Sequence, residues 1–215
     1  MSDHIAHMFG TQHYSLFLLS AILLNITPGQ DTLYIVGRSI AQGRRAGLLS
    51  VLGISSGAVI HILAAAFGLS AILAASASAF SVVKFVGAAY LVYLGIRMWF
   101  DHSASSQGPA KFTQVSSLGI FRAGLFTNLL NPKVAMFNLA FLPQFVDPSA
   151  HSKFVALLFL GASCLTTGTI WCVFLALAAS GIGSRLRTNT SAIAVIRQAT
   201  GALFVGLGVR LAVNK

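Results

Sequence analysis

Long apolar runs constrain this chain most, because about 20 apolar residues in helical form cross the hydrocarbon core of a bilayer. Six such runs follow one another along the 215 residues. They are Leu16–Val36, Leu48–Leu73, Phe80–Phe100, Phe121–Val146, Phe154–Ile182 and Ile193–Val213. Only 8% of the residues are charged, which is too few to cover a surface that faces water. We therefore predict an all-α, polytopic protein with six transmembrane helices in a single transmembrane domain (1–215).

The distribution of charge favours a membrane over nucleic acid as the partner of this basic chain. Lys and Arg number 14 against 4 acids, a formal net charge of +10. The basic residues lie mostly between the apolar runs and do not interleave with aromatic residues, as they would on a nucleic-acid-binding surface. The connections that hold Arg44 and Arg45, Lys111, and Arg185 carry most of the positive charge and should face the cytoplasm. Six helices then place both termini on the opposite side of the membrane.

An internal repeat divides the predicted helices into two halves. Three residues of the third run align in register with three of the sixth run: Lys84, Gly95 and Arg97 with Arg197, Gly208 and Arg210. Three helices per half means that the second half is inserted upside down, an arrangement common in secondary transporters. We predict two inverted three-helix repeats, 16–100 and 119–215, joined by a cytoplasmic linker at 101–118. The alternative is chance similarity between two helices rich in glycine and leucine.

Proline interrupts two of the runs, within Thr27–Asp31 of the first and Asn131–Lys133 of the fourth. Proline removes a backbone donor and clashes with the preceding turn, and unpaired backbone groups are not stable against lipid. Each break must therefore face protein or water. Thr27 and Asn131 are good N-caps for a second half-helix, and Pro28 and Pro132 suit its first position. Gln30 can complete a capping box.

Two half-helix N-termini are thus predicted near the bilayer centre, where their free N–H groups and partial positive charge suit a carboxylate. Asp31 is the acid that lies well inside a span, and Lys133 is the complementary cation. Together they match the two charges of a zwitterionic amino acid. Asp31 could bind the substrate ammonium or carry an exchanged proton. The alternatives are two merely kinked helices and an Asp31–Lys133 ion pair without substrate contact.

Other polar residues in the spans have weaker patterns. His61 fits either a proton relay with Asp31 or a hydrogen bond to a neighbouring helix. Gly53 and Gly57 have the GxxxG spacing of close helix packing, and Cys164 and Cys172 are expected to pack between helices. We expect small residues to line the rest of the pocket: Ser56, Thr166 and Thr167. The sequence has no metal-binding, cofactor or enzyme motif, so we expect no cofactor and predict a transporter rather than an enzyme.

The motif Asn25–Asp31, followed by Gly43–Gly47, resembles the LysE/RhtB family of amino-acid exporters, and Asn131–Lys133 and the six apolar runs fit that family too. The resemblance implies export of amino acids or close derivatives (lysine, arginine, homoserine, threonine or homoserine lactone) through a bacterial inner membrane, so that both termini would be periplasmic. It also implies a proton gradient or the membrane potential as driving force. The candidate substrate-binding residues are Asn25, Thr27, Pro28, Gly29, Gln30, Asp31, Asn131, Pro132 and Lys133.

Two other classes of membrane protein compete with an exporter. A non-transporting scaffold or enzyme subunit would not need charges at the helix breaks. A channel would more often carry a ring of like charges or a carbonyl filter. The sequence leaves open the exported amino acid, the coupling ion and the formation of a homodimer.

Overall fold

The computed structural model describes residues 9–75 and 114–182, together with isolated positions between 82 and 96 and between 198 and 209. Its elements, all helical, are α2 (Tyr14–Ile26), α3 (Gln30–Ala75), α5 (Ser117–Leu129), α6 (Pro132–Met136), the π-helix η2 (Phe137–Phe141), the 3₁₀-helix η3 (Leu142–Phe145) and α7 (Lys153–Ile182). Apart from those isolated positions, the predicted helices Phe80–Phe100 and Ile193–Val213 lie outside the described residues, as do most of the linker 101–118 and the aligned repeat residues. Four of the six predicted spans can therefore be compared with the structure.

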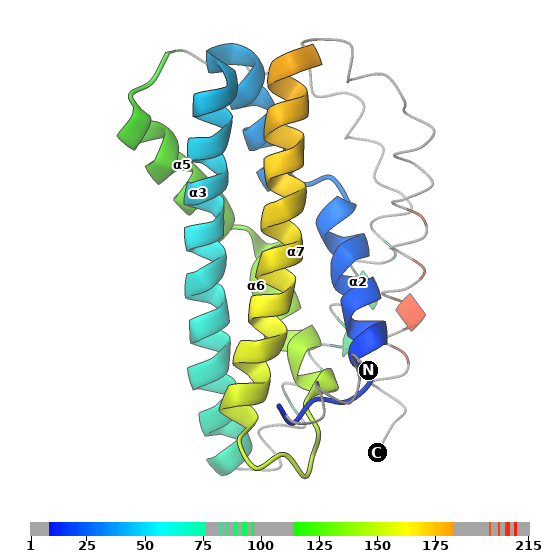
Figure 1. Cartoon of the computed structure of the whole chain (residues 1–215). Coiled ribbons are helices and arrows are strands. Elements are labelled where there is room, and N and C mark those ends of the chain that lie inside the picture. The colour runs from blue at the N-terminus through cyan, green and yellow to red at the C-terminus, as the bar shows by residue number, and fades with distance from the viewer. Residues whose placement is uncertain are drawn as a thin grey trace.

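Helix α3 consists of two arms that meet at Gly43, and the chain reverses direction there (Figure 1). Gly43 has φ +79° and ψ −175°, a conformation that is essentially restricted to glycine. The first arm (residues 30–42) and the second arm (residues 44–75) then pack closely, with Gly47 against the side chain of Ser39. The Gly43–Gly47 motif thus forms the tight turn between the first and second predicted spans.

The first predicted span is broken, as its sequence indicates, although its caps differ from the prediction. Helix α2 ends at Ile26, and the backbone N–H and hydroxyl of Thr27 both donate to Leu23 O, at 3.1 and 2.7 Å. The next helix begins at Gln30, and Gly29 O accepts from Leu33 N at 3.0 Å. The assignment of Thr27 as N-cap, Pro28 as first helical residue and Gln30 as capping-box partner is therefore wrong. A threonine hydroxyl also bonds the carbonyl four residues back, and here that bond closes the preceding helix.

The fourth predicted span is broken where the sequence predicts. Helix α5 begins after the N-cap Ser116 and ends at Leu129. Asn131 then caps α6, because its side-chain oxygen accepts from Lys133 N at 3.0 Å, and Pro132 lies in the first turn. The chain continues through η2 and η3 to Phe145, and such π-helical and 3₁₀ irregularities recur at functional sites. The predicted N-cap and proline positions of this break are confirmed.

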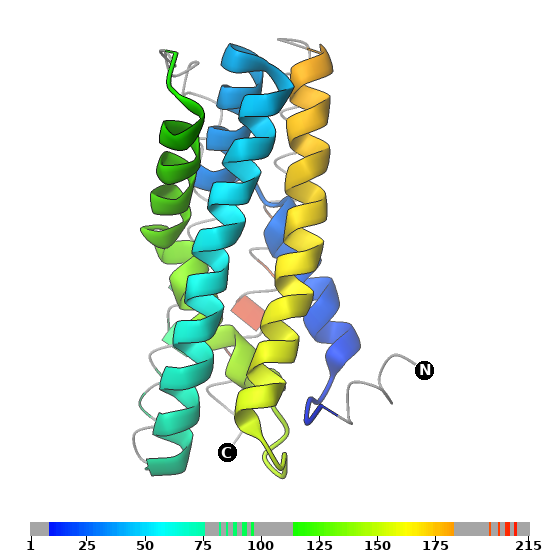
Figure 2. The same ribbon diagram turned by 60° about the vertical axis from the view of Figure 1, so that its left-hand side comes forward.

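Glycines allow α3 and α5 to pack backbone against backbone. A Cβ added at Gly53 would collide with the carbonyl of Phe121, and one at Gly57 would lie 2.9 Å from Leu125 O. Helix α5 contributes a glycine to the same contact, since a Cβ added at Gly124 would lie 2.9 Å from Ser50 O of α3. The predicted packing role of the GxxxG pair is therefore confirmed, and α3 and α5 lie side by side (Figure 2).

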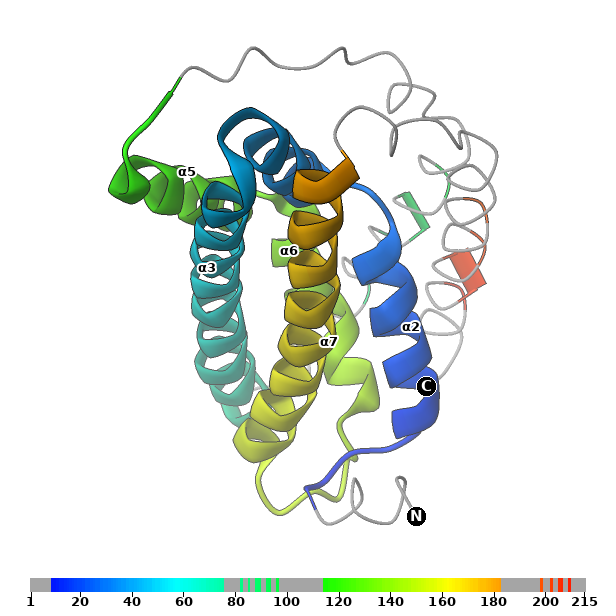
Figure 3. The same cartoon turned by 45° about the horizontal axis from the view of Figure 1, so that its top comes forward.

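Helix α7 runs between α3 and α2, as Figures 1 and 3 show. A core at the end of the molecule where α7 begins is formed largely by phenylalanines: Phe17, Phe137, Phe141 and Phe145. Large apolar side chains cover the outside, with Phe67 64% and Ile170 66% exposed. Helical segments long and apolar enough to cross a membrane extend over Gln30–Leu69 and Lys153–Gly181. Such an exposed apolar surface is suited to lipid.

Candidate functional site

The two helix breaks contact each other. Lys133, just after the second break, donates from Nζ to Thr27 O at 3.1 Å and to Leu24 O at 3.2 Å. In the other direction, Asn131 Nδ2 donates to Asp31 Oδ1 at 3.2 Å. The breaks lie beside the middle of α7, where Asn25 Nδ2 donates to Thr167 Oγ1 at 3.1 Å. The expected meeting of the two breaks is therefore confirmed.

Asp31 lies in the first turn of α3 and is held by two asparagine amides. Asn128 Nδ2 donates to its Oδ2 at 2.7 Å, and Asn131 supplies the second hydrogen bond. Both asparagines are buried, at 2% and 4% exposure. Lys133 and His61 are close enough to interact electrostatically with the carboxylate. The two amide hydrogen bonds satisfy a carboxylate at a position where a charge without partners would be costly.

The two charges stabilise opposite ends of the first break rather than forming a direct pair. The Lys133 ammonium donates to Leu24 O in the last turn of α2 and to Thr27 O at its C-cap, where carbonyls at a helix end are satisfied from outside the helix. Asp31 lies at the start of α3, where the helix dipole favours a negative charge. Within the described part of the chain, each charge therefore bonds to neutral partners, the amides of Asn128 and Asn131 or the carbonyls of Leu24 and Thr27.

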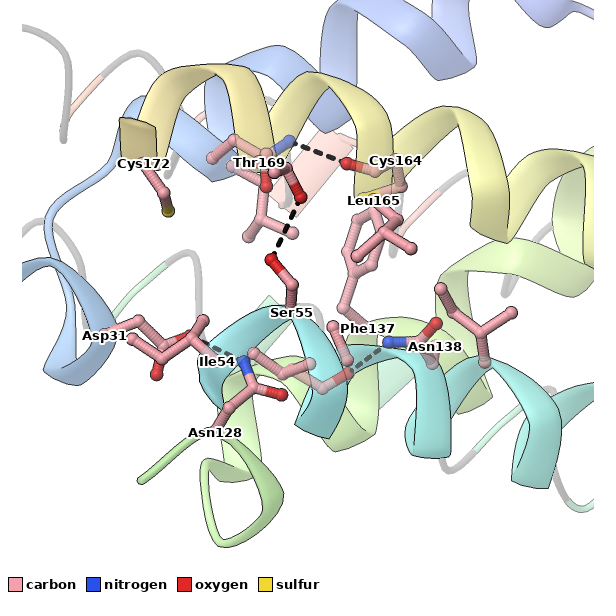
Figure 4. Close-up of a pocket in the computed structure, with 16 residues that line it drawn as sticks. Asp31, Ile54, Ser55, Asn128, Phe137, Asn138, Cys164, Leu165, Thr169 and Cys172 are labelled. Atoms are coloured by element: carbon pink, nitrogen blue, oxygen red, sulfur yellow. Dashed lines mark hydrogen bonds between the residues drawn. The ribbon is translucent and has the colours of Figure 1, made fainter. Parts of the chain in front are cut away.

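A cavity of about 100 Å³ lies between α3, α7 and the fourth span (Figure 4). This is several times the roughly 10–15 Å³ that one water requires. The residues that line it are Leu24, Asn25, Asp31, Ile54, Ser55, Ala58, Ile62, Asn128, Val134, Phe137, Asn138, Cys164, Leu165, Gly168, Thr169 and Cys172. Every described helical segment except η3 contributes at least one side chain. Both cysteines belong to this wall and also pack against the hydrophobic cores, as expected.

The cavity wall contains two of the sequence-predicted site residues, Asn25 and Asp31. The other predicted residues lie outside the lining set: Thr27, Pro28, Gly29, Gln30, His61, Asn131, Pro132 and Lys133. Seven of these residues lie within or next to the two breaks, and the eighth, His61, lies in the second arm of α3. His61 Nε2 lies 3.2 Å from Asn128 O, so one asparagine connects this ring to the Asp31 carboxylate.

The small polar residues expected to line the pocket differ from the ones found there. Ser56 and Thr166 are bonded to carbonyls of their own helices, and Thr167 contacts Asn25. Ser55 and Thr169 line the cavity instead, with their hydroxyl oxygens 3.1 Å apart. One residue of displacement turns a side chain by about 100° around a helix, and the sequence alone did not define that rotation.

The model of the LysE-type translocators matches residues 22–215. The chain belongs to this family. It is 31% identical to an uncharacterized membrane protein of Vibrio cholerae, over 93% of this chain and 96% of that protein. No solved structure matches it.

Two further relatives have names that state an activity. The chain is 29% identical to a leucine efflux protein of Salmonella typhimurium, over 95% of this chain and 96% of the relative. It is 31% identical to a homoserine/homoserine lactone efflux protein of the same organism, over 91% and 94% of the two chains. These alignments cover nearly all of each protein, so the LysE-type translocator described here is a membrane protein of similar length to its relatives.

Asn128 and Asn138 are functional candidates of this LysE-type translocator that the sequence analysis missed. Both line the cavity and are buried, at 2% and 6% exposure. A usable signal was present, since polar amides in a transmembrane segment usually face other helices. Asn128 also lies three residues before Asn131, so the two amides share a side of the fourth span and reach the same carboxylate.

Proposed function

We propose that this LysE-type translocator exports amino acids or close derivatives from the bacterial cytoplasm through the inner membrane by alternating access. The observation that carries this proposal is the position of Asp31, which lies at the junction of two broken spans and also lines the central cavity. Broken helices that surround a site near the middle of the membrane are a recurring design of secondary transporters. The names of the two efflux proteins point to amino acids as the substrate class.

Asp31 binds the substrate ammonium in this proposal. Its two asparagine partners orient the carboxylate, and its place on the cavity wall makes it accessible to a small solute. The first backbone amides of α3, at residues 30–32, precede the first bond from Leu33 N to Gly29 O. Such amides bind anions, so we assign the substrate carboxylate to this helix start. Lys133 holds the end of α2 and adds positive charge nearby; its direct contact with substrate stays a prediction.

The proposed topology places the Gly43 turn at the cytoplasmic side and both termini in the periplasm. Arg44 and Arg45 at this turn are exposed, which suits anionic lipid headgroups. The two broken spans run in opposite directions in Figure 1, one from α2 into the first arm of α3 and the other from α5 into α6. This antiparallel arrangement supports two inverted repeats.

Proton coupling through Asp31 and His61 belongs to the same proposal. The carboxylate and the ring contact different atoms of Asn128, so the two titratable groups lie on either side of one residue, and water would have to carry a proton between them. The membrane potential is the alternative driving force, and efflux from proteoliposomes with an imposed proton gradient or an imposed potential distinguishes the two. A homodimer stays a prediction.

Export can be tested in cells that accumulate amino acids from dipeptides. We expect Asp31→Asn to lower efflux by about tenfold or more, because it removes a charge-assisted hydrogen bond to the ammonium. The matched control is Asp147→Asn, the same chemical change in the loop before α7, where the carboxylate accepts from Ser149. If Asp31→Asn reaches the membrane in normal amount and exports as well as the parent, Asp31 is not the ammonium site. If the parent exports no amino acid, the exporter proposal fails.

A further inference from the structure

The central cavity has a charged end and an apolar end. Asp31 and Asn128 lie at one end in Figure 4, and Phe137 and Leu165 lie at the other. Ile62, which also lines the cavity, closes against Gly161 of α7, where an added Cβ would collide with it. A substrate whose ammonium binds Asp31 therefore directs its side chain toward hydrocarbon.

Most donors of the wall are already bonded to the protein, whereas Asn128 Oδ1 at the Asp31 end is buried without a partner. Ser55 and Thr169 bond to each other, and Asn25 donates to Cys164 O and Thr167 Oγ1. At the apolar end, Asn138 donates from Nδ2 to Val134 O at 2.9 Å. A charged substrate side chain would lose its water and would have to compete with these internal bonds, which is unfavourable.

The charge of the site also opposes a second cation. The whole sequence has four acids, and Asp31 is the one among the described residues that line the cavity. Two asparagine amides already bind its carboxylate, and the Lys133 ammonium lies nearby. The side-chain ammonium or guanidinium of a basic amino acid would therefore reach the apolar end without a carboxylate partner.

We infer that this cavity selects amino acids with an uncharged, compact apolar side chain, the valine, leucine and isoleucine class, and rejects lysine and arginine. This inference rests on the proposed export function and names its substrate class. Asp31 recognises the ammonium that all amino acids share, while Phe137, Leu165 and Ile62 distinguish their side chains. Discrimination arises from the missing partner for a second charge.

The first test uses the native chain. Cells that lack their own exporters are loaded with dipeptides of leucine, valine, lysine and arginine, and the release of each amino acid is compared with and without the protein. We expect faster release of leucine and valine by about tenfold or more relative to the basic pair. Faster release of lysine or arginine than of leucine would overturn the substrate class but leave export intact. Release of no amino acid would instead refute the proposed function.

The second test inverts the specificity by an isosteric change. Asn138→Asp places a carboxylate at the end of the cavity opposite Asp31, where it can pair with a basic side chain. We expect it to lower leucine release and to raise lysine release above the level of the parent. His151→Asp is the control, since it adds the same charge at an exposed position of the loop before α7, outside the cavity lining, and should keep leucine export without gaining lysine export. Leu165→Asp gives the same test from α7 if Asn138→Asp does not reach the membrane. No gain of lysine release in either acidic variant present in the membrane would contradict the inference.

Discussion

Lys133 Nζ lies 3.1 Å from Thr27 O, so a cation of one broken span completes the end of the helix in the other. The ammonium also bonds Leu24 O at 3.2 Å. Carbonyls in the last turn of a helix have no partner within it, and the hydrocarbon core offers no water to replace one. The Lys133 contacts therefore explain how an interruption of the helix between Ile26 and Gln30 is stable in the interior of the protein.

Replacing Lys133 should destabilise the junction of the two spans. Lys133→Met keeps the length and apolar stem of the side chain but leaves both carbonyls without their donor. We expect a loss of about 1.5–3 kcal/mol for a charge-assisted hydrogen bond, seen as a lower melting temperature of the purified protein in detergent. Lys153→Met, at the first residue of α7, is the control and should melt close to the parent. Equal melting temperatures for both variants would show that Lys133 does not stabilise the break.

The contact between Gly53 and Phe121 predicts a large effect of a single methyl group. Gly53→Ala places its Cβ against the Phe121 carbonyl, a backbone atom that cannot move aside like a flexible side chain. We expect about 1–3 kcal/mol of destabilisation from overpacking, measured by thermal unfolding. Gly68→Ala on the same helix has no atom within 4 Å of the added Cβ and should be neutral or slightly stabilising. A Gly53→Ala variant as stable as Gly68→Ala would contradict the close packing of α3 and α5.

Gly43 should resist substitution because of its backbone conformation rather than its surroundings. Its added Cβ would meet nothing within 4 Å, but φ is +79°. We expect Gly43→Ala to cost about 1–3 kcal/mol and to increase cleavage at this turn in limited proteolysis. Gly181→Ala also meets open space, at a position without positive φ, and should leave the digestion pattern unchanged. Unaltered proteolysis of Gly43→Ala would mean that the turn adopts another conformation.

The sequence predicted the broken spans because proline and the lack of water in a bilayer leave few alternatives. The same physics correctly predicted the cap at Asn131, whose short amide bonds the amide of Lys133. It failed at Thr27, since a threonine hydroxyl can cap the following helix or bond the preceding one. Lys133, which is distant in the sequence, contacts Thr27 O, and this contact is compatible with a Thr27 hydroxyl that bonds the preceding helix.

The cavity was less predictable than the breaks. Asp31 could be found because an acid inside a span requires partners, but the partner Asn128 could not be assigned without the packing of α5 against α3. The choice between Ser55 and Ser56 likewise depends on the rotation of the second arm of α3, which the glycine contacts with α5 determine. Sequence patterns thus located the region of the site, and helix packing determined which side chains enter it.

The two cysteines provide a direct probe of the cavity. Cys164 and Cys172 are the two cysteines of the sequence, and both line the cavity wall. We expect a small membrane-permeant maleimide, used at high concentration because buried thiols react slowly, to inhibit export by the native protein, since its adduct would occupy space that the substrate needs. Variants Cys164→Ser and Cys172→Ser leave one thiol each, and the double variant should export normally and be insensitive to the reagent.

Protection by substrate then distinguishes cavity modification from a general effect on folding. Cys172 and Asp31 both line the cavity and lie at the same end of it in Figure 4, so a bound amino acid whose ammonium contacts Asp31 should shield this thiol. We therefore expect leucine to slow the labelling of the Cys164→Ser variant by severalfold and lysine to have little effect, measured by mass spectrometry of the labelled protein. A reagent can reach a thiol in an occupied site only after the substrate leaves, so a thiol in the substrate path is labelled more slowly when substrate is bound. Labelling at the same rate with and without each amino acid would therefore show that the thiol lies outside the substrate path.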